Sequence, residues 1–515
     1  MGSIVSVSAV LTRDAVRMNT DFPPLAFARD MPPAVLNRRI GTGELIRAAR
    51  GIYVRAGQDP KKLVRGNWSR VAGYLFPGAV ISGRSAPSGA PVGDTIFLAK
   101  GTRMREKRMA GLNIVVAAGA GAAEGDIPIP GGLYLASKPR AILDNLRSSR
   151  STRLHAPWSL RPAELEEWLD RLRSVQGEAA LRTWLEELPA IAAMLHVPKD
   201  ELVSAEAAIS SVLGDKQGTP RSHALRARRE GRPFDQERVR RFRSLILALQ
   251  RSAPQAKGAS RADPRWSNAP FFEACFSNYI EGVKFQLDQA IGIIFRNETV
   301  PQREPEVQDL AGTYAVVSDV AQMSTVATSG AEFLEILKHR HRQVMRGRPE
   351  YAPGSFKTRP NSAGRTVFVQ PELVEGTLVE GFTGLLELDG AFQRAVYTMF
   401  LVSEVHPFID GNGRVARIAM NAELVAKDEA RIIIPPVFQD DYLGALRRLS
   451  RGGDPRPVIQ ALRFAQDVVA ACDFSTLASA RSDLETAHAF HEGDEGFRLR
   501  IPDLTTRASG DATTA

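Results

Sequence analysis

The spacing of apolar residues from Arg161 onward limits the fold more than any other feature of the chain. Two groups repeat at three- and four-residue intervals: Leu165, Trp168, Leu169 and Leu172, then Leu181, Trp184, Leu185 and Leu188. An apolar stripe at this spacing lies on one face of an amphipathic helix. Further segments with helical spacing are residues 236–249, 271–290, 307–324, 331–345, 374–388, 391–405, 414–426 and 457–471. The sequence therefore predicts a mainly α-helical fold.

Residues 1–150 have a different character. Residues 51–55 and 95–100 are short β-branched and aromatic runs bounded by Gly, Pro or Asp, which is typical of strands. Residues 67–75 favour a short helix between them. We therefore expect a small α/β domain at the N-terminal end.

This N-terminal segment also holds the positive charge of the chain. It contains 22 Lys and Arg against 10 Asp and Glu, whereas the whole chain of 515 residues has a formal charge of +9. A local basic surplus is the electrostatic footprint of a nucleic-acid partner. A basic face that only contacts solvent would give the same composition, so both interpretations stay open.

Changes in composition predict the domain boundaries. Residues 252–264 are rich in Ser, Ala, Pro and Gly, which indicates a linker. We predict four parts: a basic domain over residues 1–155, a helical connector over 156–255, a helical domain over 265–480 and a disordered tail over 492–515.

Cysteine content and hydropathy restrict the environment of the protein. Cys275 and Cys472 lie far apart and offer neither a disulfide framework nor metal-ligand spacing. We find no stretch with the ~20 apolar residues of a membrane span and expect no secretory signal. These features predict a cytoplasmic protein that does not bind membranes.

The most specific segment runs from His406 to Arg417 and reads HPFIDGNGRVAR. Gly411 and Gly413 would permit positive φ and turn backbone N–H groups toward one point at a helix start, where anions bind. Arg414 and Arg417 are three residues apart, so they share a helix face and can bind phosphate oxygens. The segment therefore indicates phosphate chemistry.

Two further residues of this segment fit the same chemistry. Asp410 offers hard oxygen ligands of the kind that Mg²⁺ accepts beside phosphates. His406 has an ordinary pKa near neutrality, which suits a general base.

With this segment the chain resembles the Fic (filamentation induced by cAMP) family, whose signature H-x-F-x-D/E-G-N-G-R-x-x-R is filled at every position. The resemblance implies an all-helical core with the motif in a loop and helix start. It also implies an adenylyltransferase that moves AMP from ATP to a Ser, Thr or Tyr hydroxyl of a target protein.

The same resemblance implies a role for each motif residue. His406 would deprotonate the target hydroxyl, Asp410 would hold Mg²⁺, and Phe408 would fill the core beneath the loop. The phosphates of ATP would be bound by Gly411, Asn412, Gly413, Arg414 and Arg417.

Residues 354–369 show a strand–turn–strand pattern with its turn at Gly364. The pattern is similar to the family's flap hairpin, which aligns an extended target segment by strand addition. The docking residues would be Thr366, Val367, Phe368 and Val369. An ordinary surface hairpin is the alternative. Tyr442, Leu443 and Leu446 would line an adenine pocket or simply pack in the core.

Residues 277–282, SNYIEG, resemble the family's inhibitory motif S/T-x-x-x-E-G/N. Ser277 and Glu281 are four residues apart and would share one face of a helix over residues 271–285. The resemblance implies that Glu281 pairs with Arg417, the group meant for the γ-phosphate. The enzyme would then be autoinhibited.

The N-terminal region resembles the winged-helix regions of AbiEi-like antitoxins at residues 48–54, 80–86 and 138–147. This resemblance implies a winged helix that binds DNA. A structural or target-recruiting domain is the alternative.

The sequence as a whole predicts an autoinhibited, Mg²⁺-dependent protein adenylyltransferase with an N-terminal recognition domain. One alternative is a Fic enzyme that mainly removes AMP or uses another nucleotide donor. Another is a DNA-binding regulator whose Fic domain senses nucleotide. His339 and His341 lie in a basic helical stretch and are expected at the surface.

Overall fold

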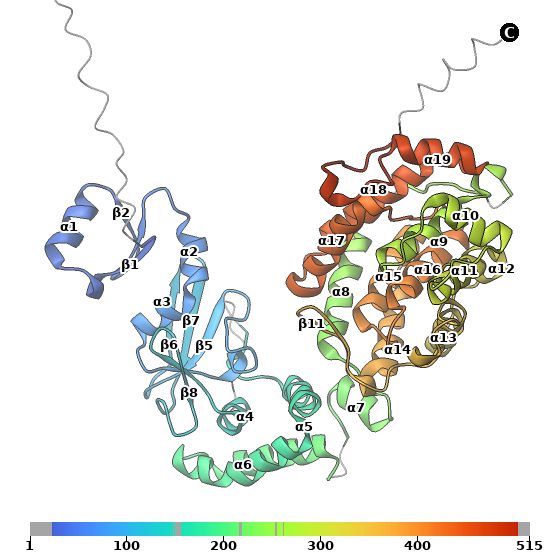
Figure 1. The fold of residues 1–515 in the computed structure, drawn as a ribbon. Helices are drawn as coiled ribbons and strands as arrows, with labels where there is room; N and C mark the ends of the chain where they lie inside the picture. The colour runs from blue at the N-terminus through green and yellow to red at the C-terminus, as the bar shows by residue number, and fades with distance from the viewer. Residues whose placement is uncertain are drawn as a thin grey trace, which may run out of the picture. The chain divides into compact units, whose positions relative to one another are not determined.

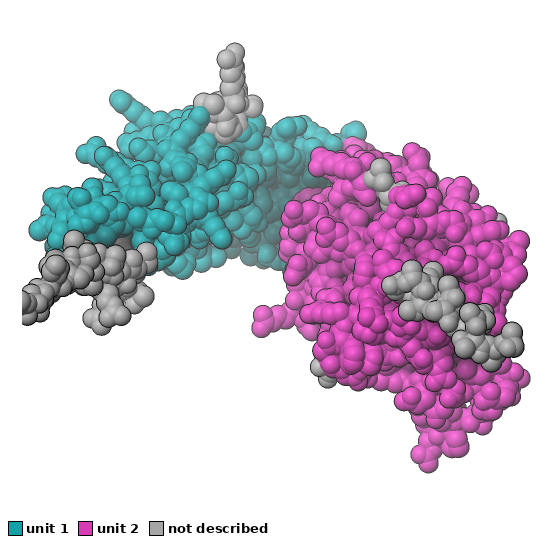
Figure 2. All heavy atoms as spheres, turned by 90° about the horizontal axis from the view of Figure 1, so that it is seen from above, with its two compact units in different colours: residues 1–225 teal, residues 226–515 magenta. Residues whose placement is uncertain are grey.

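The computed structural model of the protein describes residues 23–147, 149, 156–215, 219–252, 255–260 and 262–502. It divides into two compact units, residues 1–225 and 226–515 (Figure 2). The division falls inside residues 156–255, which the sequence predicts as a connector.

The first unit contains two β-sheets (Figure 1). A three-stranded antiparallel sheet has the order β1 (Leu25–Phe27), β3 (Ile52–Arg55), β2 (Leu45–Ala49), with α1 (Pro33–Gly41) between its first two strands in the chain. A six-stranded mixed sheet has the order β6 (Arg105–Met109), β7 (Leu112–Ala117), β5 (Thr95–Ala99), β4 (Val80–Ile81), β9 (Leu133–Leu135), β8 (Ile127–Ile129). The predicted α/β character of this region is confirmed.

Helices complete the first unit. They are α2 (Pro60–Gly66), α3 (Trp68–Leu75), α4 (Lys138–Leu146), α5 (Pro162–Met194), α6 (Lys199–Leu213) and α7 (His223–Arg229), which crosses the division. Gly177 has a positive φ of 84° and kinks α5. The two apolar stripes predicted from the sequence lie on either side of this kink and pack with α4 and α6.

In the second unit, α15 (Ala391–Val405) and α16 (Asn412–Val425) are buried along almost their whole length and pack against each other. A helix that is buried on all sides forms the core of its domain. The surrounding helices are α8 (Gln236–Gln250), α9 (Ala269–Ile280), α10 (Leu287–Arg296), α11 (Glu304–Ser318), α12 (Val320–Ser324), α13 (Gly330–Val344), α14 (Val374–Leu385), α17 (Gln439–Gly452), α18 (Arg456–Ala471) and α19 (Leu477–Thr486) (Figure 1).

Two predicted helices are each divided in two. The helix predicted over residues 271–290 stops at Ile280, because Gly282 adopts a positive φ of 87° before α10 begins. The helix predicted over 307–324 is interrupted at Asp319, whose side chain accepts hydrogen bonds from the first backbone N–H groups of α12. Neither α17 nor α19 is predicted from the sequence, which assigns Tyr442, Leu443 and Leu446 of α17 to a pocket lining or to the core.

The described parts of the predicted linker and tail are held in the second unit. The backbone N–H of Ala430 donates to the Lys257 carbonyl, and that of Ala259 donates to the Asp428 carbonyl. Arg500 donates to the Thr486 carbonyl at 2.7 Å, so order continues past residue 492, where the predicted tail begins. Residues 253–254, 261 and 503–515 lie outside the described residues.

Among the described residues, no helix is both long enough and apolar enough to cross a bilayer.

Candidate active site

The loop that carries the predicted motif joins the two buried helices of the second unit. His406 ends α15 with a left-handed φ of 54°, and Gly411 precedes α16 with a φ of 75°. A β-carbon at Gly411 would lie 2.7 Å from Met345 Sδ, so the position requires glycine. The expectation of positive φ is correct for Gly411 and wrong for Gly413, which lies inside the first turn of α16.

An aromatic stack supports this loop from the core. Phe408 is fully buried, as predicted, and its ring lies parallel to that of His341 with the centroids 3.7 Å apart. The Gly354 N–H donates to His341 Nδ1, so the ring proton lies on Nε2, which donates to the Asp410 carbonyl at 3.0 Å. Burial lowers the pKa of His341 to about 4. The prediction that His341 is a surface residue is therefore wrong, whereas His339 is exposed.

The Asn412 side chain closes the loop on itself. Its Oδ1 accepts from the Phe408 N–H at 2.8 Å, and its Nδ2 donates to the Phe408 carbonyl at 2.9 Å. The amide thus fixes the backbone that precedes α16. The first-turn N–H groups of a helix have no intrahelical acceptor and favour an anion.

His406 lies in a pocket of about 320 Å³. Its ring stacks on Phe368 with the centroids 3.7 Å apart, and its Nδ1 lies 3.3 Å from the Ser403 carbonyl. Because a carbonyl only accepts, Nδ1 carries the proton and Nε2 keeps a free lone pair. Burial lowers the pKa of His406 to about 4. The side chain is therefore neutral near pH 7 and able to accept a proton.

Lys357 is a neighbour of His406 that the sequence did not single out. Burial, followed by the charge of Arg238, lowers the pKa of the Lys357 ammonium to about 8. Its Nζ donates to Asn361 Oδ1 at 2.6 Å, and its charge helps to lower the pKa of His406.

Arg417 reaches both residues of the predicted inhibitory motif. Its Nη2 donates to Glu281 Oε1 at 2.7 Å and to the Ser277 carbonyl at 2.8 Å, while its Nε donates to Ser277 Oγ at 3.0 Å. A β-carbon at Gly413 would lie 2.1 Å from Glu281 Oε1, so a larger residue there would displace this carboxylate. Glu281 caps α9 at its C-terminal end, whereas the predicted helix continued to residue 285.

Arg414 is buried and contacts two residues to which the sequence analysis gave no role. Its Nη1 lies 3.1 Å from Asp309 Oδ2 and 3.4 Å from Asn278 Oδ1. Asp309 is fully buried on α11 and also accepts from Arg348 Nε at 2.8 Å. Asp309 is one of three acidic residues of α11, with Glu304 and Glu306, and the local sequence does not show which of them pairs with Arg414.

Asp410 suits the Mg²⁺ ion that the sequence predicts. Its carboxylate side chain is 46% exposed, and Oδ2 lies 3.8 Å from Arg414 Nη2, beyond hydrogen-bonding distance. Among the described residues, no group of three or more His, Cys, Asp or Glu side chains could hold a metal ion. Mg²⁺ commonly binds through one or two carboxylates together with phosphates and water. Asp410 could serve as such a ligand.

The predicted flap is shorter than expected. The hairpin pairs β10 (Ser362–Ala363) with β11 (Thr366–Val367), with Gly364 at a φ of 56° in the turn. Val367 is exposed, whereas Phe368 lies against His406 and Val369 is buried in the core. Only the first two of the four predicted docking residues therefore lie on the hairpin strand.

The pocket brings part of the sequence-predicted residues together, whereas Asp410, Gly411, Asn412 and Arg414 are not among its lining residues. Its lining includes His406, Gly413, Arg417, Glu281, Thr366, Phe368, Tyr442, Leu443 and Leu446. Residues 333–424, which carry the loop and both buried helices, match the sequence model of the Fic/DOC family. They form a Fic/DOC domain. Ser277 and Glu281 lie outside this matched segment of the chain.

Known protein adenylyltransferases are similar to this chain over more residues than the Fic/DOC match covers. The protein adenylyltransferase fic-1 of Caenorhabditis elegans is 30% identical over 125 residues, 23% of this chain and 24% of that protein. Its counterpart from Caenorhabditis briggsae is 23% identical over 268 residues, 51% of this chain and 52% of that protein. The chain therefore spans about half or less of the length of these relatives.

A solved structure is also similar to the protein. The structure of Fic-1 from C. elegans has a TM-score of 0.34 and 17% identity, and the match covers 59% of this chain and 85% of that one.

Proposed function

We propose that the protein acts in the cytoplasm as an adenylyltransferase that moves AMP from ATP to a Ser, Thr or Tyr hydroxyl of a target protein. We further propose that Glu281 holds it inactive. The observation that supports this most strongly is the triple contact of Arg417 with Ser277 and Glu281, in the pocket that also contains His406. The names of the matched adenylyltransferases support the same activity.

His406 would act as the general base. The target oxygen would attack the α-phosphorus of ATP while its proton passes to the free Nε2 of His406. As the new oxygen–phosphorus bond forms, the bond from the α-phosphorus to the bridging oxygen breaks, and pyrophosphate leaves. A neutral imidazole is required for this step, and the lowered pKa of His406 provides it.

The phosphates would be held by the start of α16. First-turn N–H groups of the helix and the guanidinium groups of Arg414 and Arg417 supply positive charge where negative charge develops. Mg²⁺ held by Asp410 would neutralise further phosphate charge.

Glu281 would block this arrangement. Its carboxylate occupies Arg417 Nη2 and lies over Gly413, where it adds negative charge beside the phosphate site. ATP that binds without the Arg417 contact would be misaligned for in-line attack. The exposed strand of the β10–β11 hairpin would align the target segment by strand addition.

The test uses ATP labelled at the α-phosphate with Mg²⁺ and follows the label on protein. We expect Glu281→Gly to become labelled, wild type to remain weakly labelled, and the His406→Ala/Glu281→Gly double variant to remain unlabelled. Glu298→Gly is a matched control, because Glu298 also follows a helix end but pairs with Arg296. Absence of label on Glu281→Gly, with its target fraction present and ATP bound, would contradict the proposal.

Removal of AMP is a second candidate, favoured by one observation. Glu281 and His406 line the same pocket, so the carboxylate could orient a water molecule toward a bound phosphodiester. The water oxygen would then displace the target hydroxyl, which takes up a proton. Loss of label from a modified target, abolished by Glu281→Gln, would distinguish this activity.

For the first unit we propose DNA binding. Arg38 on α1, Arg47 on β2 and Arg50 beside it are exposed, which agrees with the basic surplus of this region. Full-length protein should bind duplex DNA with an affinity that falls steeply with salt, and Arg38→Glu/Arg47→Glu should lose that binding. An equal affinity of this variant and the wild type for duplex DNA would contradict the proposal.

A further inference from the structure

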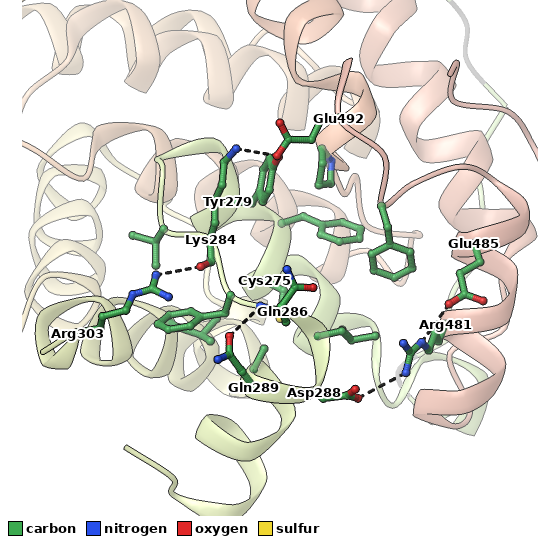
Figure 3. Close-up of a pocket in the computed structure, with 18 of the residues that line it drawn as sticks. Cys275, Tyr279, Lys284, Gln286, Asp288, Gln289, Arg303, Arg481, Glu485 and Glu492 are labelled. Carbon is green, nitrogen blue, oxygen red and sulfur yellow. Dashed lines mark hydrogen bonds and ion pairs between the residues drawn. The ribbon is translucent and has the colours of Figure 1, made fainter. Parts of the chain in front are cut away.

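A second pocket, of about 650 Å³, lies beside α9 and shares no lining residue with the pocket of His406 (Figure 3). Residues two apart on a helix point about 200° apart. Tyr279 accordingly lines this second pocket, whereas Ser277 and Glu281 contact Arg417. We call it the rear pocket.

The walls of the rear pocket combine apolar and polar side chains. The apolar ones include Phe276, Val283, Phe285, Leu287, Leu310 and Phe490. Phe276 and Phe490 meet edge to face with their centroids 5.5 Å apart, which joins α9 to the segment after α19. A cavity of this volume is large enough for a small ligand.

One end of the rear pocket already binds a carboxylate of the chain itself. Glu492 Oε1 accepts hydrogen bonds from Tyr279 Oη and from Lys284 Nζ, the latter at 2.8 Å (Figure 3). Arg303 lies beside them, where its Nη2 donates to the Lys284 carbonyl and its guanidinium covers the Phe285 ring at 4.0 Å. Tyr279 and Lys284 thus form a site for an acid group, whereas the Arg303 guanidinium pairs with Glu306.

Glu492 is a replaceable occupant of that site. The Lys284 and Glu492 side chains are 52% and 49% exposed, and ion pairs this accessible to water contribute little to stability. The other acidic side chains of the pocket contact other partners: Asp288 and Glu485 with Arg481, and Glu495 with His491. An incoming acid therefore finds its best partners at the Lys284 end.

We propose that the rear pocket is an effector site for a small molecule with a carboxylate or sulfonate on an aromatic or other apolar body. Its acid group replaces Glu492 on Tyr279 and Lys284, and its apolar part lies between Phe276, Phe285 and Phe490. Binding relieves the inhibition by Glu281; this regulatory part rests on the proposed transfer of AMP.

The link to the active site is the turn after α9. Glu281 and Gly282 lie between Tyr279 and Lys284, both of which Glu492 ties to the segment after α19. A ligand in place of Glu492 leaves those two residues bound to a free molecule instead of to the rest of the fold. The turn can then move, and Glu281 leaves Arg417 more readily.

The binding test uses anilinonaphthalene sulfonate, an acidic aromatic dye that fluoresces in apolar pockets. We expect saturable binding to the full chain, about tenfold weaker binding by Lys284→Gln, and tighter binding by Glu492→Gln, which has lost the competing charge. Lys338→Gln is the matched control: Lys338 also pairs with a carboxylate, Glu335, and lies over an aromatic ring. Equal dye affinity for wild type and Lys284→Gln would overturn the site.

The regulatory test repeats the labelling with saturating dye. We expect label on the wild type to rise several-fold and label on Glu281→Gly to stay the same, because that variant has no inhibitory carboxylate. Dye that binds without raising the wild-type label overturns the effector role. If Glu281→Gly carries no label, the proposed transfer fails, and the dye titration still decides whether the rear pocket binds acids.

Discussion

Ser277 Oγ accepts a hydrogen bond from Arg417 Nε at 3.0 Å, next to the contact of the same guanidinium with Glu281. This bond fixes the plane of the guanidinium so that Nη2 points at the carboxylate. The Ser277 carbonyl accepts from the same Nη2 and depends on the backbone alone. The hydroxyl is thus one of three contacts that hold the inhibited arrangement.

We therefore expect Ser277→Ala to relieve inhibition only in part. Loss of one hydrogen bond to a charged group costs about 1.5–3 kcal/mol, which corresponds to a labelling rate about tenfold or more above the wild type. The rate should remain below that of Glu281→Gly. Labelling with α-phosphate-labelled ATP measures both rates, and Ser318→Ala, which removes an intrahelical hydroxyl bond on α11, is the control. A rate equal to the wild type would show that the hydroxyl does not contribute.

The buried His341 should make stability depend on pH. Its pKa in the folded protein is about 4, below the ordinary value of about 6.5, so the unfolded chain binds the proton more readily. The stabilisation is complete above about pH 6.5 and is lost as the pH falls toward 4. We expect a loss of order 1–3 kcal/mol from this residue.

Thermal unfolding at about pH 7.5 and pH 5 measures this loss. His341→Gln should reduce the difference between the two midpoints, because it removes the titrating ring. The exposed His339→Gln should leave the difference unchanged. An unchanged difference in His341→Gln would show that other groups cause the pH dependence.

The order of the helices and the identity of the site were largely predictable because both depend on local sequence. Apolar spacing placed α15 at residues 391–405 as observed, and the motif placed His406 in a loop and Arg417 on the helix that follows. The pairing of Glu281 with Arg417 was implied by the resemblance of residues 277–282 to the family's inhibitory motif, and the structure contains that contact.

The failures have physical causes in tertiary structure. His341 carries a polar ring into the core because Gly354 and Asp410 satisfy both of its nitrogens, and no local pattern shows that. The prediction of one helix over residues 271–290 did not take account of Gly282, whose left-handed backbone conformation ends α9 beside Glu281.

Asp309 is another buried polar residue whose contacts no local sequence pattern reveals, and those contacts predict a large contribution to stability. It is fully buried between Arg348 and Arg414, with contacts of 2.8 and 3.1 Å. Removal of one partner from a buried ion pair leaves uncompensated charge and costs about 3–5 kcal/mol. Asp309→Ala should lower the free energy of unfolding by that amount in urea denaturation, whereas Asp454→Ala, at an exposed pair with Arg456, should change it little. A small effect of Asp309→Ala on the free energy of unfolding would indicate that water or another group of the chain compensates the charge of Arg414.

Asp410 should determine the requirement for Mg²⁺ without supporting the fold. Its carboxylate is 46% exposed and lies 3.8 Å from its nearest cation, Arg414, so Asp410→Asn should leave the urea midpoint unchanged. In the Glu281→Gly background, the Mg²⁺ concentration for half-maximal labelling should rise about tenfold, since an amide oxygen carries no charge for the ion. Chelation of Mg²⁺ should abolish labelling in both proteins. Asp454→Asn is the control for loss of an exposed carboxylate, and an equal Mg²⁺ requirement in Asp410→Asn would exclude Asp410 as the ligand.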